Sequence, residues 1–264
     1  MKKRKISTEK ILLFLLVLLA ILAILGPVLS PYTYDGQDVT ARNLGMSWIH
    51  WFGTDKFGRD LFTRVCCGIR LSLLIGAISA MICGGIGTLI GGAAGYIGGK
   101  TDLVLSELMN ILSAVPSLLY IILIQLVFHG GMGSVILGFC VAGWVDLARL
   151  FRAETMRQKE MEYCMAAKMM GVSSFRIIGK YILPNARQLL KVQMLLLVPK
   201  AIFTEAFLSF LGIGIAAPQA SLGTLIQDAK AQIMLYPLQM VYPVVILILL
   251  FLSLQGIITK EQRL

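Results

Sequence analysis

Long runs of apolar residues, separated by short polar segments, restrict this chain more than any other feature of its sequence. A helix needs about 20 mainly apolar residues to cross the hydrocarbon layer of a bilayer. Six runs approach or exceed this length: 11–29, 71–97, 103–128, 135–150, 189–213 and 241–258. Hydrophobic residues make up 57% of the chain and charged residues 14%, more apolar surface than a soluble domain of 264 residues can bury. We expect an all-α membrane protein, one domain of six transmembrane helices surrounded by the lipid bilayer.

The first apolar run follows the basic sequence MKKRK, a combination that also begins a secretory signal peptide. The run is long for such a peptide and lacks a small-residue cleavage site, so we expect an uncleaved anchor. The predicted order is a cytoplasmic tail at 1–10, the first helix at 11–29 and an extracellular segment at 30–70. A transmembrane core at 71–258, with a long polar loop at 150–188, and a cytoplasmic tail at 259–264 complete the chain.

The basic residues predict the orientation of these helices. With the N-terminus inside the cell, seventeen Lys and Arg residues fall in inner segments and six in outer ones. Basic residues are retained on the cytoplasmic side, so both termini are expected there, in a multi-pass protein of the cell membrane. The net charge of +10 then needs no nucleic-acid partner, because most of it lies where anionic lipid of the inner leaflet would be.

The segment 162–185, EYCMAAKMMGVSSFRIIGKYILPN, is a charged, amphipathic stretch between two apolar runs. We expect one short helix from Glu162 to Met170, a break at Gly171, and a second helix that ends at the pair Leu183 and Pro184. Two short helices with a bend would form a projection that fits a groove on a partner. The alternative is an amphipathic loop that lies on the membrane surface.

Methionines gather in this loop, at positions 161, 165, 169 and 170. Helical spacing brings them together as a flexible apolar face, suited to docking on another protein.

Nothing in the sequence indicates a catalytic or cofactor site. The stretch GYIGGKT resembles a phosphate-binding loop, but that motif needs a glycine where this chain has Ala94, and it needs a preceding strand. The five cysteines have no CxxC spacing and are expected to be small buried residues. His50 and His129 are too far apart in sequence to indicate a metal site. We expect no cofactor and no ATP binding by this chain.

Glycines of the second run recur every four residues, at Gly87, Gly91 and Gly95. One face of this helix is therefore almost free of side chains. We expect another helix to approach it closely, as small residues allow in membranes.

Polar side chains at membrane depth are costly and normally face protein or water. Asn110 and Gln125 lie in the third run together with Pro116, and Glu205 lies in the fifth. Two interpretations stay open for Glu205: it lines a translocation pathway, or it makes a structural contact between helices. Asn110 and Gln125 are likewise candidates for the pathway.

Four motifs in order resemble the permeases of the dipeptide, oligopeptide and nickel ABC importer family. They are FGTDKFGRDLFTRVCCGIRLSL (52–73), WVDLARLFR (144–152), the loop at 162–185, and EAFLSFLGIGIAAP (205–218). The resemblance implies a type I ABC importer permease fold in which this loop is the coupling loop. It also implies a homologous second permease, two cytoplasmic ATP-binding subunits that hydrolyse ATP, and an extracellular solute-binding protein. The chain itself would be a transport subunit and not an enzyme.

The same resemblance implies which residues contact the ATP-binding subunits: Glu162, Ala166, Ala167, Met169, Gly171, Phe175, Leu183 and Pro184. The prevalence of peptide transport in the family implies a peptide as the substrate, and nickel or a metal chelate is the alternative. An intramembrane enzyme is less consistent with the sequence, because no nucleophile and base stand together in the apolar runs. A secondary transporter would show internal repeats, and none is visible.

Overall fold

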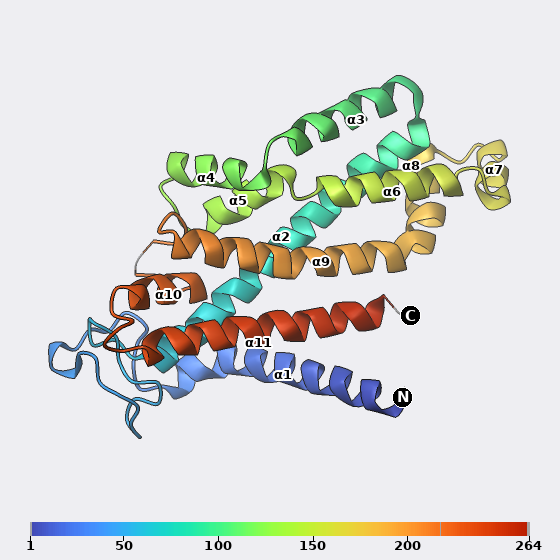
Figure 1. The fold of residues 1–264 in the computed structure, drawn as a ribbon. Coiled ribbons are helices and arrows are strands. Elements are labelled where there is room, and N and C mark those ends of the chain that lie inside the picture. Colours follow the sequence, from blue (N-terminus) through green and yellow to red (C-terminus); the bar gives the residue numbers. More distant parts are fainter. Residues whose placement is uncertain (1, 217, 263–264) are drawn as a thin grey trace. The chain divides into compact units, whose positions relative to one another are not determined.

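The computed structural model describes residues 2–216 and 218–262, and this part of the chain is helical throughout its regular structure. Met1, Arg263 and Leu264 of the predicted tails, and Ala217 of the motif at 205–218, lie outside the described residues. The helices, shown in Figure 1, are α1 (Lys2–Leu29), η1 (Val39–Ala41), α2 (Leu61–Ile97), α3 (Gly99–Ala114), α4 (Ser117–Val127), α5 (Met132–Ala142), α6 (Val145–Gln158), α7 (Glu162–Met169), α8 (Ser174–Ile177), η2 (Ile178–Ile182), α9 (Leu183–Phe210), α10 (Leu222–Lys230) and α11 (Leu238–Glu261).

Five segments of the described chain are long and apolar enough to cross a membrane. They are Lys10–Leu29, Leu61–Ile97, Met132–Gln158, Ser174–Phe210 and Leu238–Glu261. The pair α3 and α4 makes a sixth if it is counted as one span. The all-α class and a set of five to six spans therefore agree with the sequence prediction.

The third predicted run, 103–128, is not one helix. α3 and α4 are bent by 79° at the break between them, next to Pro116. Proline has no backbone N–H, and its ring pushes the preceding residue out of the helical region. Val115 accordingly adopts the extended conformation, with φ −97° and ψ 130°.

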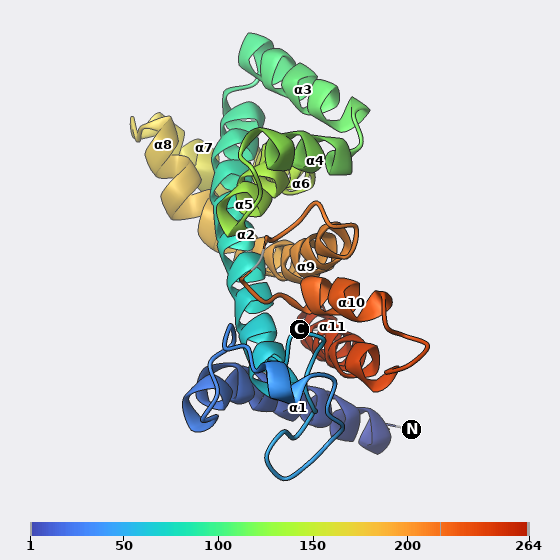
Figure 2. The same ribbon diagram turned by 90° about the vertical axis from the view of Figure 1, so that its left-hand side faces the viewer.

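The chain divides into two compact units, each of which has its own packing. The first comprises residues 1–77, 124–135 and 198–264. Within it α1 and α11 lie side by side (Figures 1 and 2), and Gly256 of α11 sits directly against Leu12 of α1. Its buried core combines residues of five helices: Leu19, Ala23, Val65, Ile69, Ile202, Leu222, Leu225, Leu250 and Leu254.

The second unit comprises residues 78–123 and 136–197. Its part of α2 packs against α6 through the glycine face. A methyl group at Gly91 would meet the carbonyl oxygen of Ala148, and one at Gly95 would come within 2.6 Å of the carbonyl oxygen of Arg152. Close approach of the two backbones thus requires glycine, which confirms the predicted helix contact.

Candidate functional site

The first helix of the predicted coupling loop is α7, Glu162–Met169, and its ends follow from its sequence. Met161 before it is extended, Glu162 places a negative charge in the first turn, and Lys168 places a positive charge in the last. Gly171 ends the helix with φ +77°, a left-handed conformation that glycine adopts without strain. The N–H of Gly171 donates to Lys168 O at 3.0 Å and that of Val172 to Ala167 O at 3.1 Å, which closes the last turn. The predicted helix and its break are both confirmed.

The second helix does not end at Leu183 and Pro184, so that prediction is wrong. α8 (Ser174–Ile177) passes into the π-helical turn η2 (Ile178–Ile182) and continues directly as α9. A proline inside a helix removes one hydrogen bond and crowds the carbonyl four residues earlier, here that of Lys180. The wider π turn just before Pro184 relieves this conflict, so the helix runs on.

One side of the coupling loop packs inside the second unit. Cys164, Ala167, Ile177 and Ile182 are all buried, none exposing more than 2% of its surface. Burial also raises the pKa of the Cys164 thiol. Cys164 is therefore a small apolar residue of the interior, as expected for the cysteines of this chain.

The other side of the loop carries apolar side chains in the open. We call Met165, Ala166, Met169, Met170 and Phe175 the apolar loop face. Met169 is 91% exposed, Phe175 81% and Met170 72%. Large apolar groups gathered in this way mark a surface that binds protein or membrane. Among the other predicted contact residues, Glu162, Gly171 and Pro184 are exposed and Leu183 is half-buried, whereas Ala167 is buried.

Hydrogen bonds from α6 fix where α7 begins. The side chain of Gln158, at the end of α6, donates from Nε2 to Glu154 Oε1 at 2.6 Å and accepts from the Tyr163 hydroxyl at 3.1 Å. Lys159 Nζ donates to Gly95 O at 3.2 Å, which ties the same turn to the end of α2. The sequence did not indicate these contacts, because Glu154, Gln158 and Lys159 lie outside the loop motif that contains Tyr163.

The three polar residues predicted for a pathway have different surroundings. Glu205 is fully buried in the first unit, where Oε1 accepts from Ser209 Oγ at 2.7 Å and Oε2 from Ser72 Oγ at 3.5 Å. Its carboxylate therefore joins α9 to α2, as a structural contact would.

Gln125 and Asn110 lie on separate units. Gln125 is buried in the first and accepts from Ser134 Oγ at 2.8 Å, while its Nε2 has no partner among the described residues. Asn110 is exposed in the second, where its Oδ1 accepts from Arg149 Nη2 at 3.1 Å. The structure thus does not bring the three residues together in one unit.

A network of charges in the first unit was not predicted. Arg59 Nε lies 2.6 Å from Asp55 Oδ2, and Arg59 Nη2 lies 3.0 Å from Asp228 Oδ2. Arg64 Nη2 is 3.5 Å from the same oxygen of Asp228. We call Asp55, Arg59, Arg64 and Asp228 the charge clasp. It joins the motif at 52–73 to α10, and only the first three residues could be seen as neighbours in the sequence.

Family models match most of the chain. The model for "Binding-protein-dependent transport system inner membrane component" matches residues 87–263, which include the coupling loop. The model for "N-terminal TM domain of oligopeptide transport permease C" matches residues 11–45.

Individual relatives agree with these matches. The dipeptide transport system permease protein DppC of Bacillus subtilis is 44% identical over 234 residues, covering 89% of this chain and 72% of the relative. The oligopeptide permease OppC of the same organism is 39% identical over 231 residues, covering 88% and 76%. OppC of Escherichia coli K12 is 37% identical over 233 residues, covering 88% and 77%.

A solved structure shares the fold. The MetNI methionine ABC transporter, in inward-facing conformations, superposes with a TM-score of 0.61 at 17% identity, over 76% of this chain and 95% of that one. At this identity the likeness concerns the fold alone.

Proposed function

The chain belongs to the family of binding-protein-dependent transport system inner membrane components and has the type I ABC importer permease fold; on this premise we propose that it forms half of the translocation pathway of a peptide importer. As a transport permease it is not itself an enzyme. The relatives named above transport dipeptides or oligopeptides, which favours peptides over nickel or a metal chelate as its substrate.

The apolar loop face is the observation that carries the coupling part of this proposal. Met169 and Phe175 expose most of their surface in a segment that is otherwise anchored firmly to α6. Seating them in a groove of a cytoplasmic ATP-binding subunit would remove this surface from water. Ala166 and Gly171 have little or no side chain, so the partner can approach the backbone closely between the two larger residues. The remaining predicted contact residues lie at the two ends and on the inner side of the loop: Glu162, Ala167, Leu183 and Pro184.

The proposed complex contains this chain, a homologous second permease, two ATP-binding subunits and an extracellular solute-binding protein. ATP-driven closure of the ATP-binding subunits pushes the two coupling loops and turns the pathway from inward to outward facing. This chain needs no cofactor of its own, because its partners bind the ATP. Asn110, Gln125 and Glu205 are proposed to line or support the pathway inside the membrane.

A labelling experiment tests the proposed orientation, in which both termini are cytoplasmic. Cysteine at Met170 should react with an impermeant maleimide only in inverted vesicles, and cysteine at Gln37 only in intact cells. Both positions are exposed, whereas Gln158 is 3% exposed and would be a poor site. Cys67, the half-buried cysteine of the described chain, is first replaced by Ser. Reaction of both positions from one side would contradict the topology.

Transport itself is tested in the complex reconstituted into liposomes with its solute-binding protein. Dipeptide or oligopeptide should stimulate ATP hydrolysis and be taken up, nickel should do neither, and the isolated chain should hydrolyse no ATP. Stimulation of ATP hydrolysis by nickel and not by peptides would show that nickel is the substrate. Hydrolysis by the isolated chain would remove the basis for separate ATP-binding partners.

A further inference from the structure

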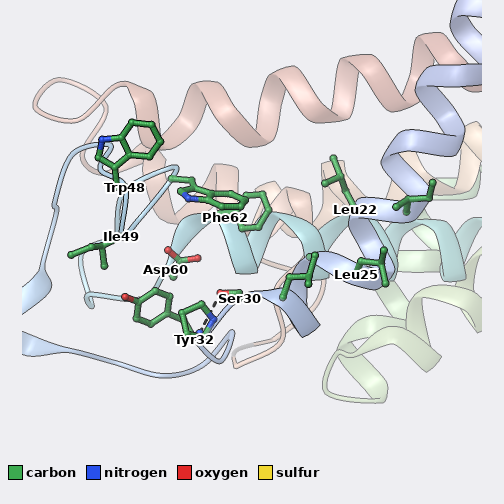
Figure 3. Close-up of a pocket in the computed structure, with 13 residues that line it drawn as sticks. Leu22, Leu25, Ser30, Tyr32, Trp48, Ile49, Asp60 and Phe62 are labelled. Atoms are coloured by element: carbon green, nitrogen blue, oxygen red, sulfur yellow. Dashed lines mark hydrogen bonds between the residues drawn. The ribbon is translucent and has the colours of Figure 1, made fainter.

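An apolar pocket of about 580 Å³ opens beside the C-terminal half of α1, entirely within the first unit. Ile21, Leu22 and Leu25 of α1 line it together with the aromatic residues Trp48, Trp51 and Phe62. Figure 3 shows Leu22 and Leu25 on the helix, with Trp48 and Phe62 on the side of the loop. Its volume lies within the range of sites that bind small molecules, roughly 300–1,000 Å³.

The Asp60 carboxylate and the Ser30 hydroxyl at the pocket already have partners inside the protein. Asp60 Oδ1 lies 2.9 Å from His50 Nδ1, and Asp60 Oδ2 accepts from the N–H of Thr63 at 2.8 Å. The Ser30 hydroxyl accepts from Thr63 Oγ1 at 2.6 Å. The pocket therefore offers mainly carbon to an occupant, which excludes a peptide or another charged solute as a good fit.

Some aromatic residues of the pocket pack against one another, and Trp48 is exposed. The Trp51 ring meets Phe62 edge to face, with centroids 4.7 Å apart, and Phe62 in turn packs against Phe52. Trp48 is 95% exposed, and its neighbour Ile49 is 69% exposed. Tryptophan is enriched where lipid headgroups meet the hydrocarbon layer, because its ring is apolar while its N–H is polar.

The depth of the pocket matches one leaflet of a bilayer. From Ile21 to Leu29, where the apolar span of α1 ends, the helix rises about 12 Å. Half of the hydrocarbon layer measures roughly 15 Å. The neighbouring face of α1 is also apolar and exposed, with Ile24 63% and Val28 77% exposed, in a segment apolar enough to cross a membrane. In a bilayer, lipid could therefore reach the pocket sideways along this face.

We propose that this pocket binds an acyl chain of a phospholipid from the leaflet in which α1 ends, the outer leaflet in the proposed topology. Trp48 and Trp51 contact the part of the acyl chain near the lipid headgroup. Leu22 and Leu25 line the deeper part of the pocket. The bound lipid fills the space between α1 and the segment that precedes α2. None of the residues that line this pocket belongs to the coupling loop or to the three residues proposed for the pathway.

Tryptophan fluorescence tests the proposal, because the chain has three tryptophans. The assembled complex, with the other subunits made free of tryptophan, is reconstituted into vesicles of phosphatidylcholine whose acyl chains carry bromine at carbons 9 and 10. One variant keeps Trp51 alone (Trp48→Phe with Trp144→Phe). The control keeps Trp144 alone (Trp48→Phe with Trp51→Phe), since Trp144 is 5% exposed.

Bromine should at least halve the fluorescence of Trp51, and this quenching should persist after fusion with a large excess of unbrominated vesicles. Trp144 should change little. In the Trp51 background, Leu22→Phe with Leu25→Phe should fill the pocket and abolish the persistent part. The matched pair Ile24→Phe with Val28→Phe, on the face outside the pocket, should keep it.

Three results would overturn the proposal. Quenching of Trp51 that falls at once with the bulk bromine content would show ordinary lipid contact without a site. Quenching in the isolated chain that disappears in the complex would show that a protein segment fills the pocket. Persistent quenching in the Leu22 and Leu25 variant, at unchanged thermal stability, would place the lipid elsewhere.

Discussion

The side chains of the charge clasp are mostly buried, whereas those of the apolar loop face are exposed. In the clasp, the Arg59 and Arg64 side chains are 6% and 2% exposed, and both carboxylates that neutralise them come from the same unit. In the coupling loop, the side chains of Met169 and Phe175 are left in the open. The charges of the clasp are paired within the chain, whereas we propose that a partner subunit covers the loop face. Changes to the clasp should therefore reduce stability, and changes to the loop face should reduce coupling.

Asp55→Ala tests the first half of this comparison and should have the largest effect. Asp55 accepts from the N–H groups of Phe57 and Arg59 and pairs with the buried Arg59 guanidinium. Removing one partner of a buried ion pair typically costs about 3–5 kcal/mol. We expect little folded protein and a much lower melting temperature in detergent. The control Asp35→Ala, at an exposed position of the same segment, should behave as wild type. A melting temperature that Asp55→Ala leaves unchanged would mean that the clasp contributes nothing to folding.

Gly171→Trp tests the second half. Among the described residues nothing lies within 4 Å of a Cβ at Gly171, so a side chain there starts in open space, where we propose that the partner binds. The positive φ adds about 1–2 kcal/mol of strain for any other residue. We expect uptake and stimulated ATP hydrolysis to fall at least roughly tenfold, as loss of a central interface contact does. Gly171→Ala carries the strain without the bulk and separates the two causes. Normal transport by the Trp variant would show that this loop does not couple.

Phe175→Ser removes one anchor of the apolar loop face without straining the backbone. Truncation of an interface residue that contributes to binding costs about 1 kcal/mol or more. We expect several-fold weaker association with the ATP-binding subunits, measured by co-purification, while the melting temperature of the chain stays constant. Val39→Ser removes an exposed apolar residue from the segment near the clasp and should leave association unchanged. Equal effects of the two variants would indicate that exposure alone, and not position, matters.

Glu205→Gln should have the smallest effect on transport. It tests whether this buried carboxylate acts in the pathway or only as a structural contact. The amide keeps an acceptor for Ser209, so assembly should be normal. A modest fall in peptide uptake is expected if the carboxylate contributes charge to the pathway. Unchanged uptake at normal expression would leave only the structural contact with Ser72. Glu205→Ala removes the acceptor altogether and should cost about 1–3 kcal/mol of stability.

Local patterns predicted the parts of the structure that depend on neighbouring residues. The apolar runs indicated the helical membrane fold, the spacing of Gly87, Gly91 and Gly95 indicated a helix contact, and Gly171 indicated the end of α7. Pro116 and Pro184 show the limit of this reasoning. The first breaks its helix with a bend of 79°, and the second lies inside a continuous one, because the η2 turn accommodates it.

The candidate site was predicted from the sequence only in part. The loop motif indicated where a partner would dock, but not which of its side chains face outward: Ala166 is exposed and Ala167 is buried. Nor did the sequence indicate that Gln158 and Tyr163 hold the loop, or that Asp228 completes the charge clasp. These depend on packing against other elements.

The sequence by itself determined that this chain resides in a membrane and which family it resembles, and it predicted the loop that we propose as the docking site. Hydrophobic burial is roughly additive along a chain, so local composition and periodicity reveal it. Only the tertiary structure decided which charges are paired, where Glu205 finds its partners and where an apolar pocket opens beside α1. Such pairings join residues far apart in the chain, and Arg59 meets Asp228 only because the folded helices bring them together.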